Sequence, residues 1–116
     1  MNTEELLQVI VDSAEDKKAQ DVVVLDIRGL SIMADYFVIC HGNSETQVQA
    51  IATAVQEKAE ELGLSIKPAE GLDHARWVLL DLGDIIVHVF HKEEREFYNL
   101  EKIWADASRI QISQSL

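Results

Sequence analysis

The chain has 116 residues, 47% of them hydrophobic, which suits a single domain with one sizeable core. Ten basic residues against 21 acidic ones give a formal net charge of −11 at pH 7. A field of that sign repels phosphate backbones and anionic membranes, which argues against general nucleic-acid and membrane binders. We expect a basic partner and little direct binding of nucleic acid, with most carboxylates keeping exposed helix faces soluble.

The sequence also indicates the cellular compartment in which the protein works. No apolar run approaches the roughly 20 residues that a membrane helix needs, so no membrane association is expected. The start, Met1–Glu5, is acidic, unlike the basic start of a signal peptide. Cys40 is the single cysteine, so no disulfide can form within the chain. These features predict a cytoplasmic protein.

An amphipathic helix and two strands are predicted in the first 41 residues. Apolar residues recur at three- and four-residue steps over Thr3–Lys18, which indicates the helix. The β-branched run within Asp21–Ile27 is too short for a helix and too apolar for an edge strand. It therefore predicts a strand buried on both faces. The second strand is expected over Tyr36–His41.

The next segment has the clearest helix signals. Gly42-Asn43 forms a turn, and Ser44 with Gln47 makes the S-x-x-Q pattern of a capping box. An apolar stripe follows at helical spacing, and Gly63 stands where a glycine ends a helix. The stripe consists of Val48, Ile51, Ala52, Val55, Ala59 and Leu62.

Three further strands and a helix are predicted after that. A short strand over Ser65–Lys67 stops before a proline, and strands over Arg76–Leu82 and Ile85–His91 are joined at Gly83-Asp84. Gly followed by Asp is typical of a two-residue type II′ hairpin turn. The last helix begins near Lys92.

The predicted order is α-β-β-α-β-β-β-α, in a single α/β (α+β) domain with a mixed five-stranded sheet. The sequence contains no internal repeat or linker. We expect this domain to cover residues 1–107 and the tail from Ser108 to Leu116 to be frayed, because the tail has no periodicity.

The last hairpin has two different faces. A two-residue turn pairs Leu82 with Ile85 and makes that face wholly aliphatic, so it should pack on helices. The opposite face combines aromatic, aliphatic and polar side chains, as interface centres do. It carries Trp77, Leu79, Asp81, Ile86, His88 and Phe90. The alternative is that the final helix covers this face through Phe97 and Trp104.

Tests for catalysis are negative. Gly42-Asn43-Ser44 is similar to the glycine-serine turn of nucleotidyltransferases, but the following predicted strand, Ser65–Lys67, has no carboxylate to hold metal. His88 and His91 are three apart on a strand, so they point to opposite faces and cannot share a metal. Cys40 lies in an apolar strand and is expected to be an inert small hydrophobe. We expect no enzyme, no metal site and no cofactor.

Several stretches carry a resemblance that spans residues 3 to about 107. They are Asp16–Ala19, Val23–Asp26, Ala34–Ile39, Gly42–Ser44, Glu70-Gly71, Trp77–Asp81, Gly83-Asp84, His88–Phe90 and Arg95–Glu101, followed by Trp104. In order and spacing they resemble the Iojap family of ribosomal silencing factors. The resemblance implies a nucleotidyltransferase-like fold without transferase chemistry. It also implies binding to the large-subunit ribosomal protein numbered fourteen, which blocks joining of the small subunit and lowers translation when nutrients are scarce.

Family members tend to form dimers when free, so the resemblance also implies a homodimer. Together with the hairpin pattern it suggests a contact surface on the ribosomal protein. The proposed apolar centre is Trp77, Leu79, His88 and Phe90, the proposed charged contacts are Glu70, Asp73 and Asp81, and Tyr98 borders the patch. Two rival hypotheses stay open: a nucleotidyltransferase that uses the Gly42 turn, and a dimeric adaptor unrelated to ribosomes.

Overall fold

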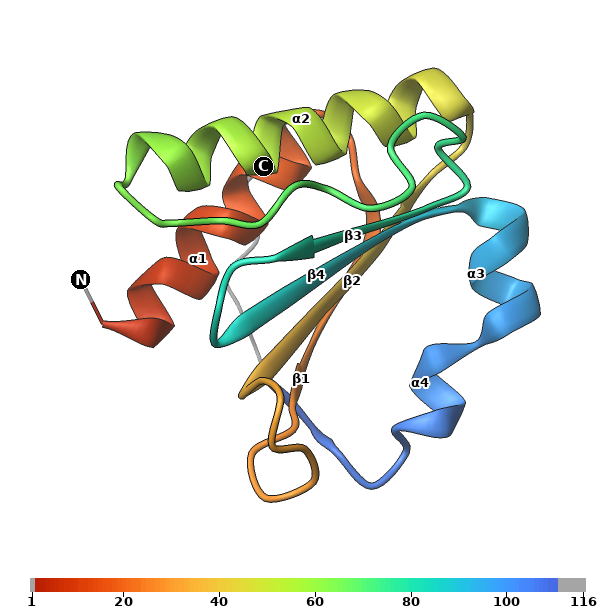
Figure 1. Cartoon of the computed structure of the whole chain (residues 1–116). Helices are drawn as coiled ribbons and strands as arrows, with labels where there is room; N and C mark the ends of the chain where they lie inside the picture. Colours follow the sequence, from red (N-terminus) through yellow and green to blue (C-terminus); the bar gives the residue numbers. More distant parts are fainter. Residues whose placement is uncertain (1, 111–116) are drawn as a thin grey trace.

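In a computed structural model of the chain, which describes residues 2–110, a mixed five-stranded sheet separates two layers of helices (Figure 1). The strands are β1 (Gln20–Asp26), β2 (Tyr36–Gly42), β3 (Trp77–Asp81), β4 (Ile85–His91) and β5 (Ser108–Ile110). The helices are α1 (Thr3–Asp16), α2 (Glu45–Glu61), α3 (Lys92–Tyr98) and α4 (Leu100–Ile103). β2 and β4 are parallel and the other neighbours antiparallel, which confirms the predicted fold class.

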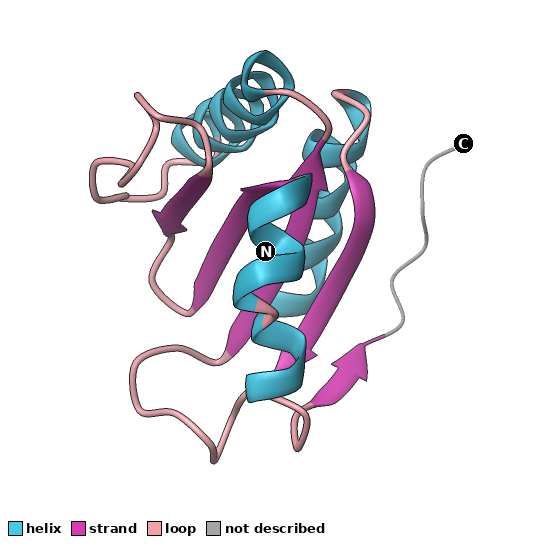
Figure 2. Ribbon diagram, turned by 90° about the vertical axis from the view of Figure 1, so that its right-hand side faces the viewer, coloured by secondary structure: helices cyan, strands magenta, loops and turns pink. Residues whose placement is uncertain are grey.

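The sheet order is β3-β4-β2-β1-β5, so β3 and β5 form its two edges (Figure 2). α1 and α2 cover one face, and α3 and α4 lie across the other. Between the sheet and the first pair of helices lies the larger core, which includes the aliphatic face of the β3–β4 hairpin. Within residues 2–110, no helix has the length and apolar character needed to cross a bilayer.

Caps fix the starts of the two long helices. The Asn2 side chain accepts the amide of Glu5 at 2.8 Å, and the Ser44 hydroxyl accepts the amide of Gln47 at 3.1 Å. The Gln47 side chain in turn accepts the amide of Asn43 at 2.7 Å, one residue before the Ser44 amide that a capping box predicts. After α2, Gly63 takes a φ of +80°, as a glycine that ends a helix does.

The hairpin register is as predicted. Trp77 pairs with Phe90, Leu79 with His88, and the Leu82 amide donates to the Ile85 carbonyl at 2.9 Å. The turn residue Gly83 has a φ of +96° whereas Asp84 is not in the positive region, which fits a type II′ turn. The two faces of the hairpin therefore differ as the alternation of the sequence requires.

The predicted order of elements is wrong at two places: the strand expected over Ser65–Lys67 and the tail that begins at Ser108. Ser65–Lys67 is irregular, because the free edge of β3 is met instead by Glu70, which forms a bridge with Leu79. Ser108–Ile110, predicted as part of a frayed tail, forms β5 and covers the outer edge of β1. Residues 111–116 of that tail lie outside the described residues. The sheet keeps five strands because β5 replaces the missing one.

Two burial predictions also need correction. Only Val24 and Leu25 of β1 are fully buried, since an irregularity at Gln20–Val23 turns its first residues toward solvent. The final helix is broken into α3 and α4 at Asn99, whose φ is +47°. Phe97, near the end of α3, is 81% exposed and does not cover the sheet. The covering is done by Leu100, Trp104 and Ala107, which pack on the second core.

Candidate functional site

Three of the predicted contact residues meet at a small hollow beside the exposed edge of the sheet. Glu70, Gly71, Trp77 and Leu79 line this hollow, whose volume is about 230 Å³. Reciprocal backbone bonds between Glu70 and Leu79, of 3.0 and 2.9 Å, hold the loop against β3. The hollow therefore presents apolar side chains with one carboxylate-bearing residue among them, in a chain of net charge −11.

Gly71 lies in the Glu70-Gly71 stretch that carries the resemblance, but the sequence did not mark it as a residue of the contact surface. It has a φ of +83°, and a Cβ built on it would lie 2.2 Å from the carbonyl oxygen of Trp77. Only glycine permits both that conformation and that approach. The signal in the sequence was a glycine directly after Glu70, two residues ahead of the next loop carboxylate Asp73. By itself a loop glycine does not show which backbone it must approach.

Substituting Gly71 with alanine is expected to lower the free energy of unfolding by about 2 kcal/mol, because the new methyl group collides with backbone and the positive φ is strained. Urea denaturation measures this. Gly29→Ala is the matched control, since Gly29 has a φ of +82° and a methyl group added there would meet nothing within 4 Å. That control should cost only about 1 kcal/mol. Equal losses in the two variants would contradict the close approach of Gly71 to Trp77.

An aromatic cluster formed by Trp77, His88, Phe90 and Tyr98 packs behind the hollow. The Trp77 ring stacks on Phe90, with centroids 5.0 Å apart and planes at 29°, and it also contacts Tyr98 at 4.8 Å. The Trp77 indole nitrogen donates to Nδ1 of His88 at 3.1 Å. Phe90 is 1% exposed and His88 is 4% exposed. Both predicted contact residues therefore lie beneath the surface and support Trp77 rather than forming the surface themselves.

The other predicted residues lie around the hollow rather than in it. Tyr98 is 43% exposed on α3 and borders the Trp77 ring, as expected. Asp81 lies at the opposite end of β3, where it accepts the Gly83 amide and pairs with Lys67 at 3.2 Å. The Gly83 amide and then Lys67 hold the pKa of Asp81 below its usual value. Asp73 is exposed in the loop before β3.

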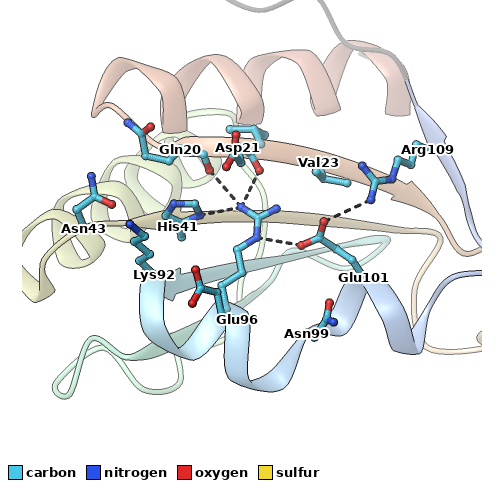
Figure 3. Close-up of a pocket in the computed structure, with 12 residues that line it drawn as sticks. Gln20, Asp21, Val23, His41, Asn43, Lys92, Glu96, Asn99, Glu101 and Arg109 are labelled. Atoms are coloured by element: carbon cyan, nitrogen blue, oxygen red, sulfur yellow. Dashed lines mark hydrogen bonds and ion pairs between the residues drawn. The ribbon is translucent and has the colours of Figure 1, made fainter.

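A second, polar cleft of about 830 Å³ lies between β1 and the α3–α4 segment (Figure 3). Its floor is the buried guanidinium of Arg95, which sequence reasoning missed. Nη1 of Arg95 donates to the Asp21 carbonyl at 2.7 Å and lies 2.9 Å from Nδ1 of His41, and Nε pairs with Glu101 at 2.9 Å. Burial, and next the positive charge of Arg95, lower the pKa of His41. These contacts tie four elements together.

The charges of this polar cleft are mixed, which favours a structural role. Its ionisable lining residues include both signs: Asp21, Glu96 and Glu101 are acidic, and Lys92, Arg95 and Arg109 are basic. Glu101 pairs with Arg95 and, at 3.4 Å, with Arg109. No single sign of charge is concentrated among these lining residues for a ligand of the opposite sign.

The residues with possible catalytic or metal chemistry are already engaged. His91, Glu93 and Glu94 come close enough to share an ion, but Arg76 pairs with both glutamates, at 2.9 and 2.6 Å. Nδ1 of His91 accepts the Glu93 amide at the start of α3. Burial raises the pKa of the Cys40 thiol to about 12, so it stays protonated at neutral pH, as expected of an inert residue.

Comparison with known proteins gives consistent results. The family model described as "RsfS: Ribosomal silencing factor during starvation" matches residues 1–116. The "Ribosomal silencing factor RsfS" of Halalkalibacterium halodurans is 56% identical over 112 residues, covering 97% of this chain and 96% of that protein. The protein of that name from Bacillus subtilis is 55% identical, with coverage of 92% and 91%. A crystal structure from Bacillus halodurans has a TM-score of 0.85 and 54% identity, covering 95% of this chain and 100% of that one.

Proposed function

Since the chain belongs to the family of ribosomal silencing factors, we propose that it binds the large ribosomal subunit through the ribosomal protein numbered fourteen and blocks joining of the small subunit. In this proposal it acts in the cytoplasm and lowers translation when nutrients are limiting. The family is regulatory and not enzymatic, and the function is associated with the ribosome. The proposal concerns the partner, the contact surface and the steric mechanism.

The observation that carries the proposal is the hollow beside Trp77. A half-buried indole held over an apolar hollow is the kind of anchor that dominates protein interfaces. The neighbouring Glu70 and the net charge of −11 favour a protein surface that is locally basic. RNA would be repelled by the same charge, so the contact with the ribosome has to be led by a ribosomal protein.

The size of the molecule supports a steric mechanism. Its principal extents are 33, 32 and 30 Å. A rigid body of that thickness, seated on the face that the small subunit approaches, keeps the two subunit surfaces far beyond contact distance. Blocking then requires neither chemistry nor a conformational change, only sufficient affinity and residence time on the large subunit.

In the free chain, several large apolar side chains are exposed. They are Leu30, Ile32, Met33, Phe97, Tyr98 and Ile103. Exposed apolar surface is costly in water and commonly becomes buried by association. On this exposure we propose that the unbound protein buries part of its apolar surface in a homodimer.

Trp77→Ala is expected to weaken binding to the large subunit by about 2 kcal/mol, roughly 30-fold, because the anchor over the hollow is lost. Sedimentation of labelled protein with purified large subunits measures the affinity. Thermal unfolding shows whether the variant is folded at the binding temperature.

Ile32→Ser is the control for nonspecific loss of apolar surface. Ile32 is fully exposed in the loop between β1 and β2, and the neighbouring Asp35 bonds to Asp84 in the hairpin turn, at the end of the sheet away from Trp77. Its substitution should leave the affinity of the monomer for the large subunit unchanged, which is measured at protein concentrations too low for self-association. A folded Trp77→Ala protein that binds as tightly as the unsubstituted chain would sink the assignment of the contact surface.

A further inference from the structure

His88 is a buried polar residue that is only half satisfied. Its side chain is 4% exposed, and its Nε2 atom is buried without a hydrogen-bond partner among the residues that the structure describes. Its ring lies edge to face with Phe37, with centroids 4.6 Å apart, and is nearly parallel to Phe90 at 6.2 Å. An imidazole in such apolar surroundings costs folding free energy that a phenylalanine would not.

Within residues 2–110, this imidazole makes one hydrogen bond, to Trp77. The indole N–H can only donate, so Nδ1 of His88 must be the acceptor and the ring proton must be on Nε2. The bond is directional, with a length of 3.1 Å. The bond therefore links the buried His88, which a partner cannot contact, to the Trp77 indole, which lines the hollow.

Stacking alone does not fix the orientation of the indole. The Trp77 ring stacks on Phe90, and it is tilted by 45° against Tyr98. Neither of these ring contacts specifies where the indole nitrogen points. The hydrogen bond to His88 does, because it requires the indole nitrogen to be directed toward Nδ1.

We propose that His88 is a positioning residue of the docking site, which locks the Trp77 indole in the orientation that shapes the hollow next to Glu70 and Leu79. The inference rests on the proposed function, in that it concerns how the same surface is prepared for its partner. The buried imidazole lowers the stability of the fold. It raises the affinity for the partner, because the Trp77 indole is already held in one orientation and does not have to be ordered on binding.

Two substitutions separate the hydrogen bond from packing. His88→Phe keeps an aromatic ring of similar volume and removes the acceptor. His88→Asn removes the ring but places an amide oxygen near the position of Nδ1. The measurements are urea denaturation, the indole N–H resonance of Trp77 in the free protein, and affinity for purified large subunits.

We expect His88→Phe to be at least as stable as the unsubstituted chain, to show a shifted and faster-exchanging indole N–H, and to bind about tenfold more weakly. His88→Asn should be less stable than the unsubstituted chain but recover the indole signal. It should also bind more tightly than His88→Leu, because leucine is similar in size to asparagine but has no hydrogen-bond acceptor. Stability and affinity thus change in opposite directions, which a purely structural role of His88 does not produce.

The outcomes separate this inference from the proposed function. If the unsubstituted chain fails to bind the large subunit, both are overturned, whatever the indole resonance shows. If it binds and the His88→Phe protein binds equally well, or the Asn and Leu variants do not differ, the positioning role is overturned and the proposed function stands. If His88→Phe does not fold, the comparison of the Asn and Leu variants decides.

Discussion

Replacing Arg95 with methionine is expected to lower the free energy of unfolding by about 3 kcal/mol. The Arg95 side chain is 10% exposed, and its guanidinium joins the Glu101 carboxylate, the Asp21 carbonyl and the His41 ring. Methionine fills much of the volume but leaves these acceptors without a donor in a partly buried site. Removal of one member of a buried ion pair is costly for that reason, even where the pair itself contributes little net stability. Denaturation in urea at neutral pH measures the loss.

Arg109→Met is the matched control, because Arg109 reaches the same carboxylate from the surface. Its side chain is 61% exposed and its distance to Glu101 is 3.4 Å. An exposed pair of this kind contributes at most about 0.5 kcal/mol. If both substitutions cost the same, Arg95 does not tie the sheet to the α3–α4 segment.

The second large expected effect is a loss of stability at mildly acidic pH that depends on His88. Burial lowers the pKa of His88 from 6.5 to about 4. Between those values the unfolded chain binds a proton at this residue and the folded chain does not, so stability falls as the pH is lowered through that window. The difference in pKa corresponds to about 3 kcal/mol between pH 7 and pH 4.

The comparison with His88→Phe isolates this contribution. The pKa of His41 is also lowered, so His41 too reduces the free energy of unfolding as the pH falls. The unsubstituted chain should therefore lose more stability at acidic pH than His88 alone accounts for. In the Phe variant the part due to His88 disappears and the curve of unfolding free energy against pH becomes flatter. Parallel curves for the two proteins would show that His88 titrates normally in the folded state and is not buried as described.

The face assignments of the hairpin follow from local sequence alone. A two-residue turn fixes which residues are paired, and the alternation of strand residues then fixes which side chains share a face. These two rules are enough to place Trp77, Leu79, His88 and Phe90 together, as the strand register confirms. The alternation does not show how deeply each of these side chains is buried. Phe90 belongs to the second core, on which Leu100 and Trp104 pack, and His88 lies against Phe37, which Trp104 also contacts. This covering depends on where the last helix places Leu100 and Trp104.

The elements that sequence reasoning missed depend on long-range contacts. Ser108–Ile110 is too short and polar to predict as a strand, and it becomes one because the edge of β1 offers free backbone groups. Arg95 reads as a solvent-facing helix residue, but its partners in β1 lie 74 and 75 positions earlier in the chain. Of the two aromatic residues in the alternative in which the final helix covers the hairpin face, Trp104 packs on the second core and Phe97 is 81% exposed on α3.

The central claim is that one bound chain keeps the ribosomal subunits apart, and a subunit-joining assay tests it most directly. Purified large and small subunits are mixed in magnesium buffer with increasing protein, and joined ribosomes are counted by light scattering and on sucrose gradients. We predict that joining falls and saturates at about one chain per large subunit, that the chain migrates with large subunits only, and that Trp77→Ala restores joining. Undiminished joining while the large subunits are saturated with the chain would contradict the claim.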